Sequence, residues 1–309
     1  MNLSGTGNLT FWVTATLISA GLTFPGSITF ELANQTHTLG DNWIVTGLVT
    51  STASTQTIND NSITCNGGLT VSGTTQGTTT FIIGGTGGVV TITSYFTCAL
   101  TFNCITATLA STWLYFGSNT MTYTAGTITT TGSTLRTRGN CTLNTNGMTW
   151  DNISFWTAGT ITLSSDLNCS GILTINGGLT ITFTGAFNIS VGSLQLITMI
   201  DNPILSLVAG QTLTITTSLY LVGEPLVGTY FPKIQSKTTS ATNLVFNGAI
   251  ADCKVAFARF NYVAYSGAIV TGLDNWYGGA TTNGSGITIR TSADIGGGAA
   301  MTDVVGSMG

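Results

Sequence analysis

Apolar and polar residues alternate along most of this chain, and each alternating run is short. Segments 68–73, 89–94 and 180–185 read GLTVSG, VVTITS and TITFTG, with hydroxyl side chains at every second position. A period of two places apolar side chains on one face of a β-strand and hydroxyls on the other. The runs end at Gly, Asn or Asp, which favour the backbone conformations of tight corners. The pattern predicts many short strands separated by sharp turns.

Short motifs recur at irregular intervals along the sequence. NGGLT occurs at 66–70 and again at 176–180, and AGTIT occurs at 125–129 and again at 158–162. Short strands joined by Asn/Gly corners are typical of a β-solenoid, in which each coil pairs with the next through the backbone. With roughly 20 residues per coil, the region from about residue 10 to about residue 250 would form on the order of a dozen coils.

We therefore predict an all-β fold, a parallel β-helix-like solenoid with a C-terminal β cap. The alternative is a β-sandwich or jelly roll, which would produce the same alternation. It is disfavoured because Asn-Gly pairs, the strongest hairpin signal, are few in this chain.

The chain is unusually poor in charge. It has 7 Lys and Arg and 11 Asp and Glu, so 6% of its residues are charged, whereas 42% are hydrophobic. Since ordinary proteins are about a quarter charged, the surface must consist of hydroxyl and amide groups.

No basic residue precedes Arg136, so we expect no nucleic-acid binding by residues 1–135, because phosphate contacts need cations. The longest apolar stretch, 194–210, contains Asp201 and Pro203, and we expect no membrane span.

The six cysteines form no CxxC pair and lie near no histidine cluster, which argues against zinc and against a disulfide framework. We expect buried thiols in apolar stacks, and neither a cofactor nor a metal. The cysteines are Cys65, Cys98, Cys104, Cys141, Cys169 and Cys253.

The composition of the sequence changes after about residue 222. Four of the seven basic residues lie between Lys233 and Arg259. We assign 1–222 to solenoid repeats and 223–290 to a capping region, because the last coil of a solenoid must hide an edge that would otherwise polymerise. The Gly-rich tail, 291–309, is expected to dock on a neighbouring molecule.

The most distinctive stretch reads LDNWYGG at 273–279 and NGSGIT at 283–288. It resembles the closing segment of repetitive β-solenoid virion-associated proteins of tailed phages, and the likeness covers residues 252–290. The resemblance implies a tail fibre, tailspike or adhesin-like protein that assembles as a homotrimer with other virion proteins. It also implies attachment to host surface glycans and a place in the virion or outside the cell. The start of the chain has no basic segment of the kind that opens a signal peptide.

Catalytic constellations are not recognisable, so we do not expect an enzyme. Glycoside chemistry needs paired carboxylates, whereas acids such as Asp41 and Asp151 stand alone and precede Asn, which is a turn signature. The sole histidine, His37, is expected at the surface or within the ladder of paired strands, and not in a catalytic site. Two alternatives stay open: a polysaccharide-degrading β-helix enzyme, and an extracellular filament or cell-surface adhesin subunit whose signal has been removed.

Glycan binding is the chemical activity that the residues favour most. Sugar rings stack on exposed aromatic rings while amides and hydroxyls satisfy their OH groups. Arg136 and Arg138, two apart, would share one strand face and could hold an anionic group. The alternative for the aromatic residues is stacking inside the solenoid. The candidates are Trp43, Trp113, Tyr115, Arg136, Arg138, Trp276 and Tyr277, with Trp150 and Trp156 as further aromatic candidates.

Overall fold

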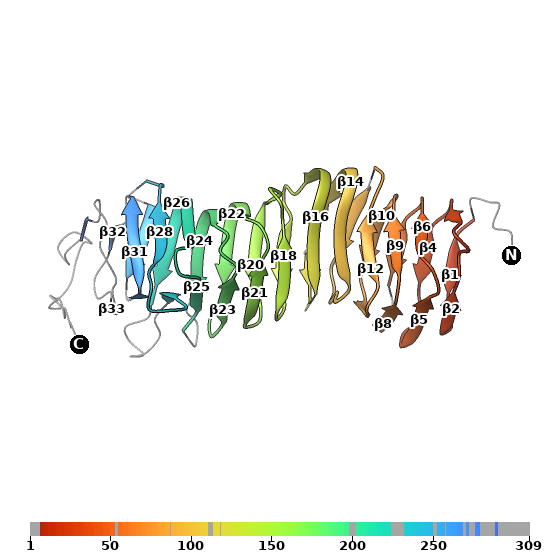
Figure 1. The fold of residues 1–309 in the computed structure, drawn as a ribbon, viewed down its shortest axis with the longest axis horizontal. Coiled ribbons are helices and arrows are strands. Elements are labelled where there is room, and N and C mark those ends of the chain that lie inside the picture. Colours follow the sequence, from red (N-terminus) through yellow and green to blue (C-terminus); the bar gives the residue numbers. More distant parts are fainter. Residues whose placement is uncertain are drawn as a thin grey trace. The chain divides into compact units, whose positions relative to one another are not determined.

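The computed structural model is all-β and has no α-helix in the part of the chain that it describes (Figure 1). Parallel strands stack there as a β-solenoid of about 11 turns, which confirms the predicted fold class. A sandwich would need antiparallel hairpins, whereas successive strands here pair one coil apart and in parallel. The described residues are 7–52, 55–86, 88–110, 114–117, 119–197, 202–223, 232–249, 252–256, 258–267, 270–271, 276–278 and 288–289.

The chain divides into two compact units, residues 1–151 and 152–309. In the first unit each early coil contributes one strand to each of three parallel columns. The first column contains β1 (Leu9–Phe11), β4 (Ile28–Phe30), β7 (Val49–Ser51), β10 (Gly68–Val71) and β13 (Val89–Ile92). The second contains β2 (Ala15–Leu17), β5 (Gln35–Leu39), β8 (Thr55–Asn59) and β11 (Thr74–Gln76).

The third column begins with β3 (Thr23–Phe24), β6 (Trp43–Val45), β9 (Ser62–Cys65) and β12 (Thr80–Ile83). It continues into β14 (Ala99–Leu109), β16 (Thr120–Thr129) and β18 (Cys141–Asn144). β14 is long enough to turn a corner, because its first residues pair with β12 and its last with β13. The other strands of this unit are β15 (Leu114–Phe116), which pairs with β17 (Thr134–Thr137), and β19 (Thr149–Trp150).

The second unit is also built from three parallel columns. One column contains β21 (Gly159–Leu163), β23 (Thr180–Thr184), β25 (Ile204–Leu207), β27 (Lys233–Ser236), β30 (Arg259–Asn261) and β33 (Trp276–Gly278). The long strands β22 (Leu167–Ile175), β24 (Ile189–Ile197) and β26 (Thr212–Val222) supply both other columns. Their first halves lead to β28 (Thr242–Phe246) and β31 (Val263–Gly267), and their second halves connect β20 (Asn152–Phe155) with β29 (Cys253–Ala256). β32 (Val270–Thr271) pairs with β34 (Thr288–Ile289).

Coil length differs between the units. Leu9 lies opposite Ile28, 19 residues later, close to the roughly 20 residues predicted. In the second unit Leu194 lies opposite Leu219, 25 residues later. The boundary at residue 222 stays a prediction, although parallel pairing continues past it because β26 pairs with β29. The tail 291–309 lies outside the described residues.

Inward side chains form continuous apolar columns along the axis of each unit. In the first unit Ile28, Val49, Leu69, Val90 and Leu109 follow one another in register and are all buried. Burying one such side chain contributes about 1.5–3 kcal/mol, so the stack of coils has a core along its length. The outward neighbours in the same strands are threonines, as the alternation predicts.

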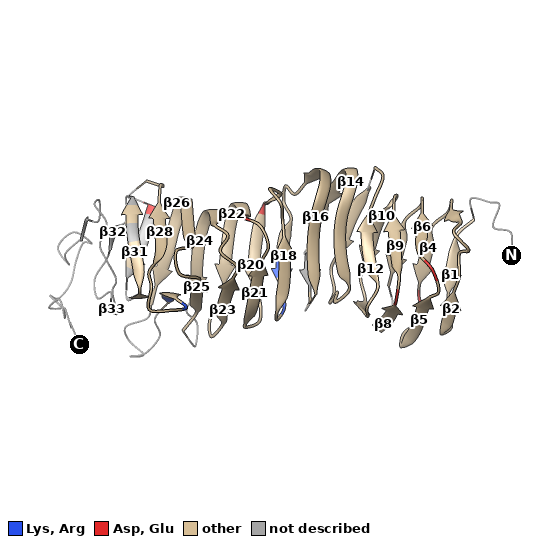
Figure 2. Ribbon diagram, in the orientation of Figure 1, with Lys and Arg blue, Asp and Glu red and all other residues tan. Residues whose placement is uncertain are grey.

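Charged residues contribute little to either unit, and Figure 2 shows only a few coloured segments on the ribbon. Several of the acids bind the turn of a neighbouring coil. The carboxylate of Asp41 accepts hydrogen bonds from the backbone N and the Oγ of Ser19, at 2.8 and 3.0 Å, and from the backbone N of Gly21 at 3.2 Å. The backbone N–H of Ser19 is the main cause that lowers the pKa of Asp41 below its usual value. Asp41 therefore has the structural role that its Asp-Asn context predicts.

Candidate glycan-binding surface

Trp43, a predicted sugar platform, lies in the core. It is inward-facing in β6 and only 6% exposed, and its ring meets that of Phe11 edge-on at 6.1 Å between centroids. The physical reason is the phase of β6, in which Trp43 and Val45 point inward while Ile44 points outward. Trp43 therefore offers no ring face to a sugar. Trp150 is fully buried as well.

Arg136 and Arg138 do not form the shared cationic face that their spacing predicts. β17 ends at Thr137, so the alternation of the strand does not extend to Arg138. Arg136 is 4% exposed, whereas Arg138 is exposed and places its guanidinium 5.6 Å from the centroid of the Tyr95 ring. Of the two arginines, only Arg138 reaches the surface, where its guanidinium and the Tyr95 ring form a cation–π pair.

The other predicted aromatic residues are not placed by the structure. Trp113 lies outside the described residues. Tyr115 lies in β15, and Trp276 and Tyr277 lie in β33, but their side chains are outside what the structure describes. Their role in glycan binding stays a prediction.

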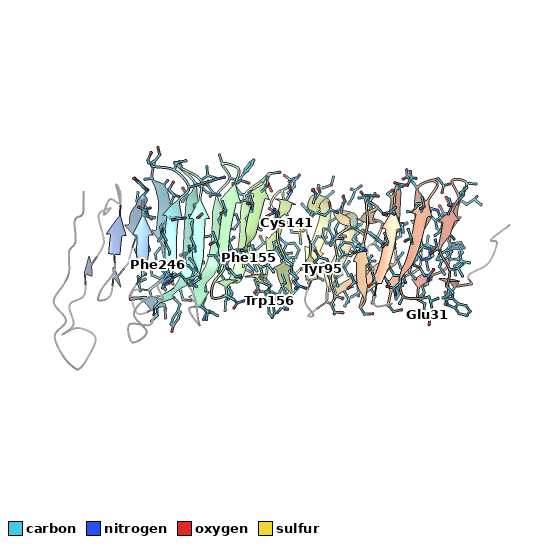
Figure 3. The ribbon with its side chains drawn as sticks, turned by 90° about the horizontal axis from the view of Figure 1, so that it is seen from below. Glu31, Tyr95, Cys141, Phe155, Trp156 and Phe246 are labelled. Carbon is cyan, nitrogen blue, oxygen red and sulfur yellow. The ribbon has the colours of Figure 1, made fainter. Side chains whose placement is uncertain are left out.

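Trp156 is an exposed aromatic residue whose surroundings the structure describes. It follows β20 and is 46% exposed, and its Nε1–H donates to the Oγ of Ser154 at 2.9 Å. Phe155 lies opposite Ile175, so Asn176 occupies the matching position one coil further on. Asn176 Nδ2 donates to the Phe155 carbonyl at 3.4 Å. We call Trp156, Ser154 and Asn176 the indole platform; Figure 3 labels Trp156 at the edge of the ribbon.

A second exposed indole, Trp12, was missed in the sequence. It is 61% exposed and its Nε1–H donates to Glu31 Oε2 at 2.9 Å, so a carboxylate of the next coil holds the ring. The signal in the sequence was the run Phe11-Trp12-Val13, because three consecutive large apolar residues cannot all face the interior of a strand with period two.

Comparison with protein-family models, with curated proteins and with solved structures found no match. No helix formed by the described residues is long and apolar enough to cross a membrane. Among the same residues, no three His, Cys, Asp or Glu side chains come together in a way that could hold a metal ion.

His37 was predicted at the surface or in a strand ladder, and it lies in the ladder of β5, opposite Ala15 and Ile58, with its side chain inside the first unit. Its ring is fully buried in β5, 5.0 Å from the Phe30 ring and 5.8 Å from the Phe11 ring. Burial lowers the pKa of His37 below 6.5, and the nearby Gln56 side chain offsets part of this effect. The imidazole therefore packs as a neutral aromatic ring.

This burial makes stability depend on pH. The unfolded chain takes up a proton on His37 as the pH falls through about 6.5, whereas burial delays this uptake to a lower pH in the folded chain. The stability is therefore present above pH 6.5 and decreases as the pH falls below it. The limiting slope is about 1.4 kcal/mol per pH unit. We expect the urea midpoint to fall between pH 7 and pH 5, and to fall less in His37→Phe. Equal slopes in both proteins would contradict this account.

Five cysteines are free and buried: Cys65, Cys98, Cys104, Cys141 and Cys169. This confirms the predicted buried thiols, while the side chain of Cys253 lies outside what the structure describes. Burial raises the pKa of the Cys98 and Cys141 thiols to about 12 and also raises those of Cys65 and Cys104.

The thiolate is the reactive form of cysteine, so these side chains should be inert in the folded chain. We expect a maleimide at pH 7.5 to leave Cys65, Cys98 and Cys141 unmodified until urea is added. Peptide mass spectrometry would locate the label, and rapid native labelling of Cys65 would contradict the placement of its coil.

Proposed function

We propose that this chain is a structural and adhesive subunit of a virion appendage, of the tail-fibre or spike kind, with a stiff, weakly charged surface that contacts host glycans. The observation that carries this proposal is the in-register stacking of coils, with apolar columns inside and hydroxyl side chains outside. The likeness of residues 252–290 to the closing segment of phage β-solenoid proteins points in the same direction.

Mechanical and proteolytic resistance follow from this construction. Backbone N–H and C=O groups of each coil bond to the coils before and after it, so opening one coil breaks two ladders. The chain also offers only 7 Lys and Arg as sites for trypsin. Both properties suit a part that works outside the cell.

Glycan contact is assigned to the indole platform. The Trp156 ring supplies the apolar face on which a sugar stacks, and the Ser154 hydroxyl fixes the ring through its Nε1–H. Asn176, on the next coil, supplies an amide for hydroxyl groups of the sugar. Trp12, which is bonded to the carboxylate of Glu31, suits an anionic host glycan less because like charges repel.

The assembly is tested by light scattering of the native chain, with and without boiling in detergent. A trimer that survives detergent is the expected result, as the resemblance implies. A heterogeneous series of large species would replace the fibre proposal with a filament subunit. A clean monomer would overturn both assemblies, and a screen for polysaccharide cleavage would follow.

Glycan contact is tested separately on an array of bacterial surface polysaccharides. Trp156→Ala should lose binding, while Trp12→Ala, which removes an even more exposed indole elsewhere, should keep it. Retention by Trp156→Ala would overturn the assignment of the platform.

A further inference from the structure

Five threonines of the first unit follow one another in register and form one rank on its outer surface. Thr10, Thr29, Thr50, Thr70 and Thr91 lie directly opposite one another on β1, β4, β7, β10 and β13. Adjacent strands lie about 4.8 Å apart, so the rank repeats one hydroxyl and one methyl group at that interval. Thr10 is exposed and the other four are partly exposed.

A second rank runs beside the first. Thr52, Ser72 and Thr93 each follow the first rank by two residues, and all three are exposed. Their backbone N–H groups donate to Phe30, Ser51 and Val71 of the preceding coil at 3.2, 2.9 and 2.8 Å, which keeps this rank in register too. The three residues each lie one position past the end of β7, β10 or β13, but these backbone bonds continue the ladder, and two residues of extended chain span about 6.6 Å. We call the eight side chains of both ranks the hydroxyl lattice.

The lattice is rigid for two reasons. Its strands rest on the buried column of Ile28, Val49, Leu69 and Val90, which continues through the same register. Threonine is also stiff about χ1 because its Cβ is branched. Little freedom remains to be lost when the hydroxyl groups are all engaged at once.

Only a periodic partner can use such a surface fully. One exposed hydroxyl gains almost nothing by exchanging one water for another, but many groups spaced to fit a lattice act together once the first is engaged. A crystalline polysaccharide is one such partner, yet sugars bind through aromatic rings, and the eight side chains of the lattice are all Thr and Ser. Trp12 and Glu31 occupy the two positions in line with the second rank at its end, where the indole N–H is bonded to the carboxylate. The strand interval is close to the oxygen repeat of hexagonal ice, and methyl groups beside hydroxyls order the adjacent water.

We propose that the hydroxyl lattice binds the surface of crystalline water, so that the chain adsorbs to ice and restrains its growth. The ligand is the ordered water lattice itself, which the hydroxyl groups of the lattice bind and the neighbouring methyl groups order. This proposal does not depend on the appendage function.

The test measures thermal hysteresis and ice recrystallisation with the full-length chain and with two double variants. Thr50→Lys/Thr70→Lys places bulky cations in the centre of the lattice. Thr131→Lys/Thr239→Lys adds the same charge at exposed turn positions that are not part of the lattice. We expect hysteresis in the native chain, a several-fold loss in the lattice variant and no loss in the control. Circular dichroism and trypsin resistance establish that each variant is folded.

Thr50→Val/Thr70→Val keeps the shape of the side chains and removes two hydroxyls, so it replaces the lysine variant if that variant fails to fold. Hysteresis that is absent from the native chain would overturn the proposal, and binding to crystalline cellulose or chitin instead would assign the lattice to polysaccharide. Equal hysteresis in the native chain and the lattice variant would also overturn it, because ice would then meet another face.

Discussion

Gly185→Ala should lower the free energy of unfolding by about 4 kcal/mol or more, a size reached only by a few kinds of substitution. Gly185 has φ of +89° at the corner after β23, and a Cβ there would lie well inside van der Waals contact with the carbonyl oxygen of Leu163 on the preceding coil. That oxygen belongs to the backbone, so the clash is relieved only by separating two coils.

Gly147→Ala is the matched control. Gly147 has the same φ of +89°, but no atom lies within 4 Å of the position of its Cβ. Gly147→Ala should lower the free energy of unfolding by about 1–2 kcal/mol, which is the usual cost of placing an L-amino acid in the left-handed backbone conformation. Urea denaturation of both variants isolates the contact between coils from the backbone strain. Equal losses would show that the two coils are not in contact at this corner.

Phe183→Ala should cost about 3–5 kcal/mol, because it removes a large side chain that cannot be replaced by solvent. Phe183 is fully buried in β23 and meets the Phe155 ring at 5.8 Å and 81°, an edge-to-face arrangement. Phe187, four residues later, is 38% exposed, so Phe187→Ala should cost much less. Comparable losses of stability in urea would contradict the inward placement of Phe183.

The solenoid itself could be predicted from the sequence because threonine and aliphatic residues mark the two faces of a strand without ambiguity. In Leu69-Thr70-Val71 only one phase buries the apolar side chains, and the structure has that phase. The coil length of about 20 residues came from what is general for solenoid repeats and not from the alternation, and Leu9 and Ile28 confirm it for the first unit.

The candidate site was harder to predict, because its residues lie where the alternation fails. In Trp43-Ile44-Val45 all three residues are apolar, so local pattern cannot decide which of them faces the core; the register of neighbouring coils decides it. Arg138 does not follow the in/out alternation of β17, because the strand ends one residue earlier, at Thr137. The pairing of Trp156 with Asn176 depends on the length of an intervening coil, and coil length varies.

Stacking in register is the claim on which both the appendage and the ice proposals depend, and disulfide trapping tests it most directly. Thr70 lies opposite Thr91, and neighbouring strands are about 4.8 Å apart, within the Cα separation that a disulfide spans. Thr93 lies two residues further along, about 8 Å from Thr70, which is beyond that reach. The account predicts that Thr70→Cys/Thr91→Cys oxidises to an intramolecular disulfide and that Thr70→Cys/Thr93→Cys does not. A disulfide in the second variant and none in the first would contradict it.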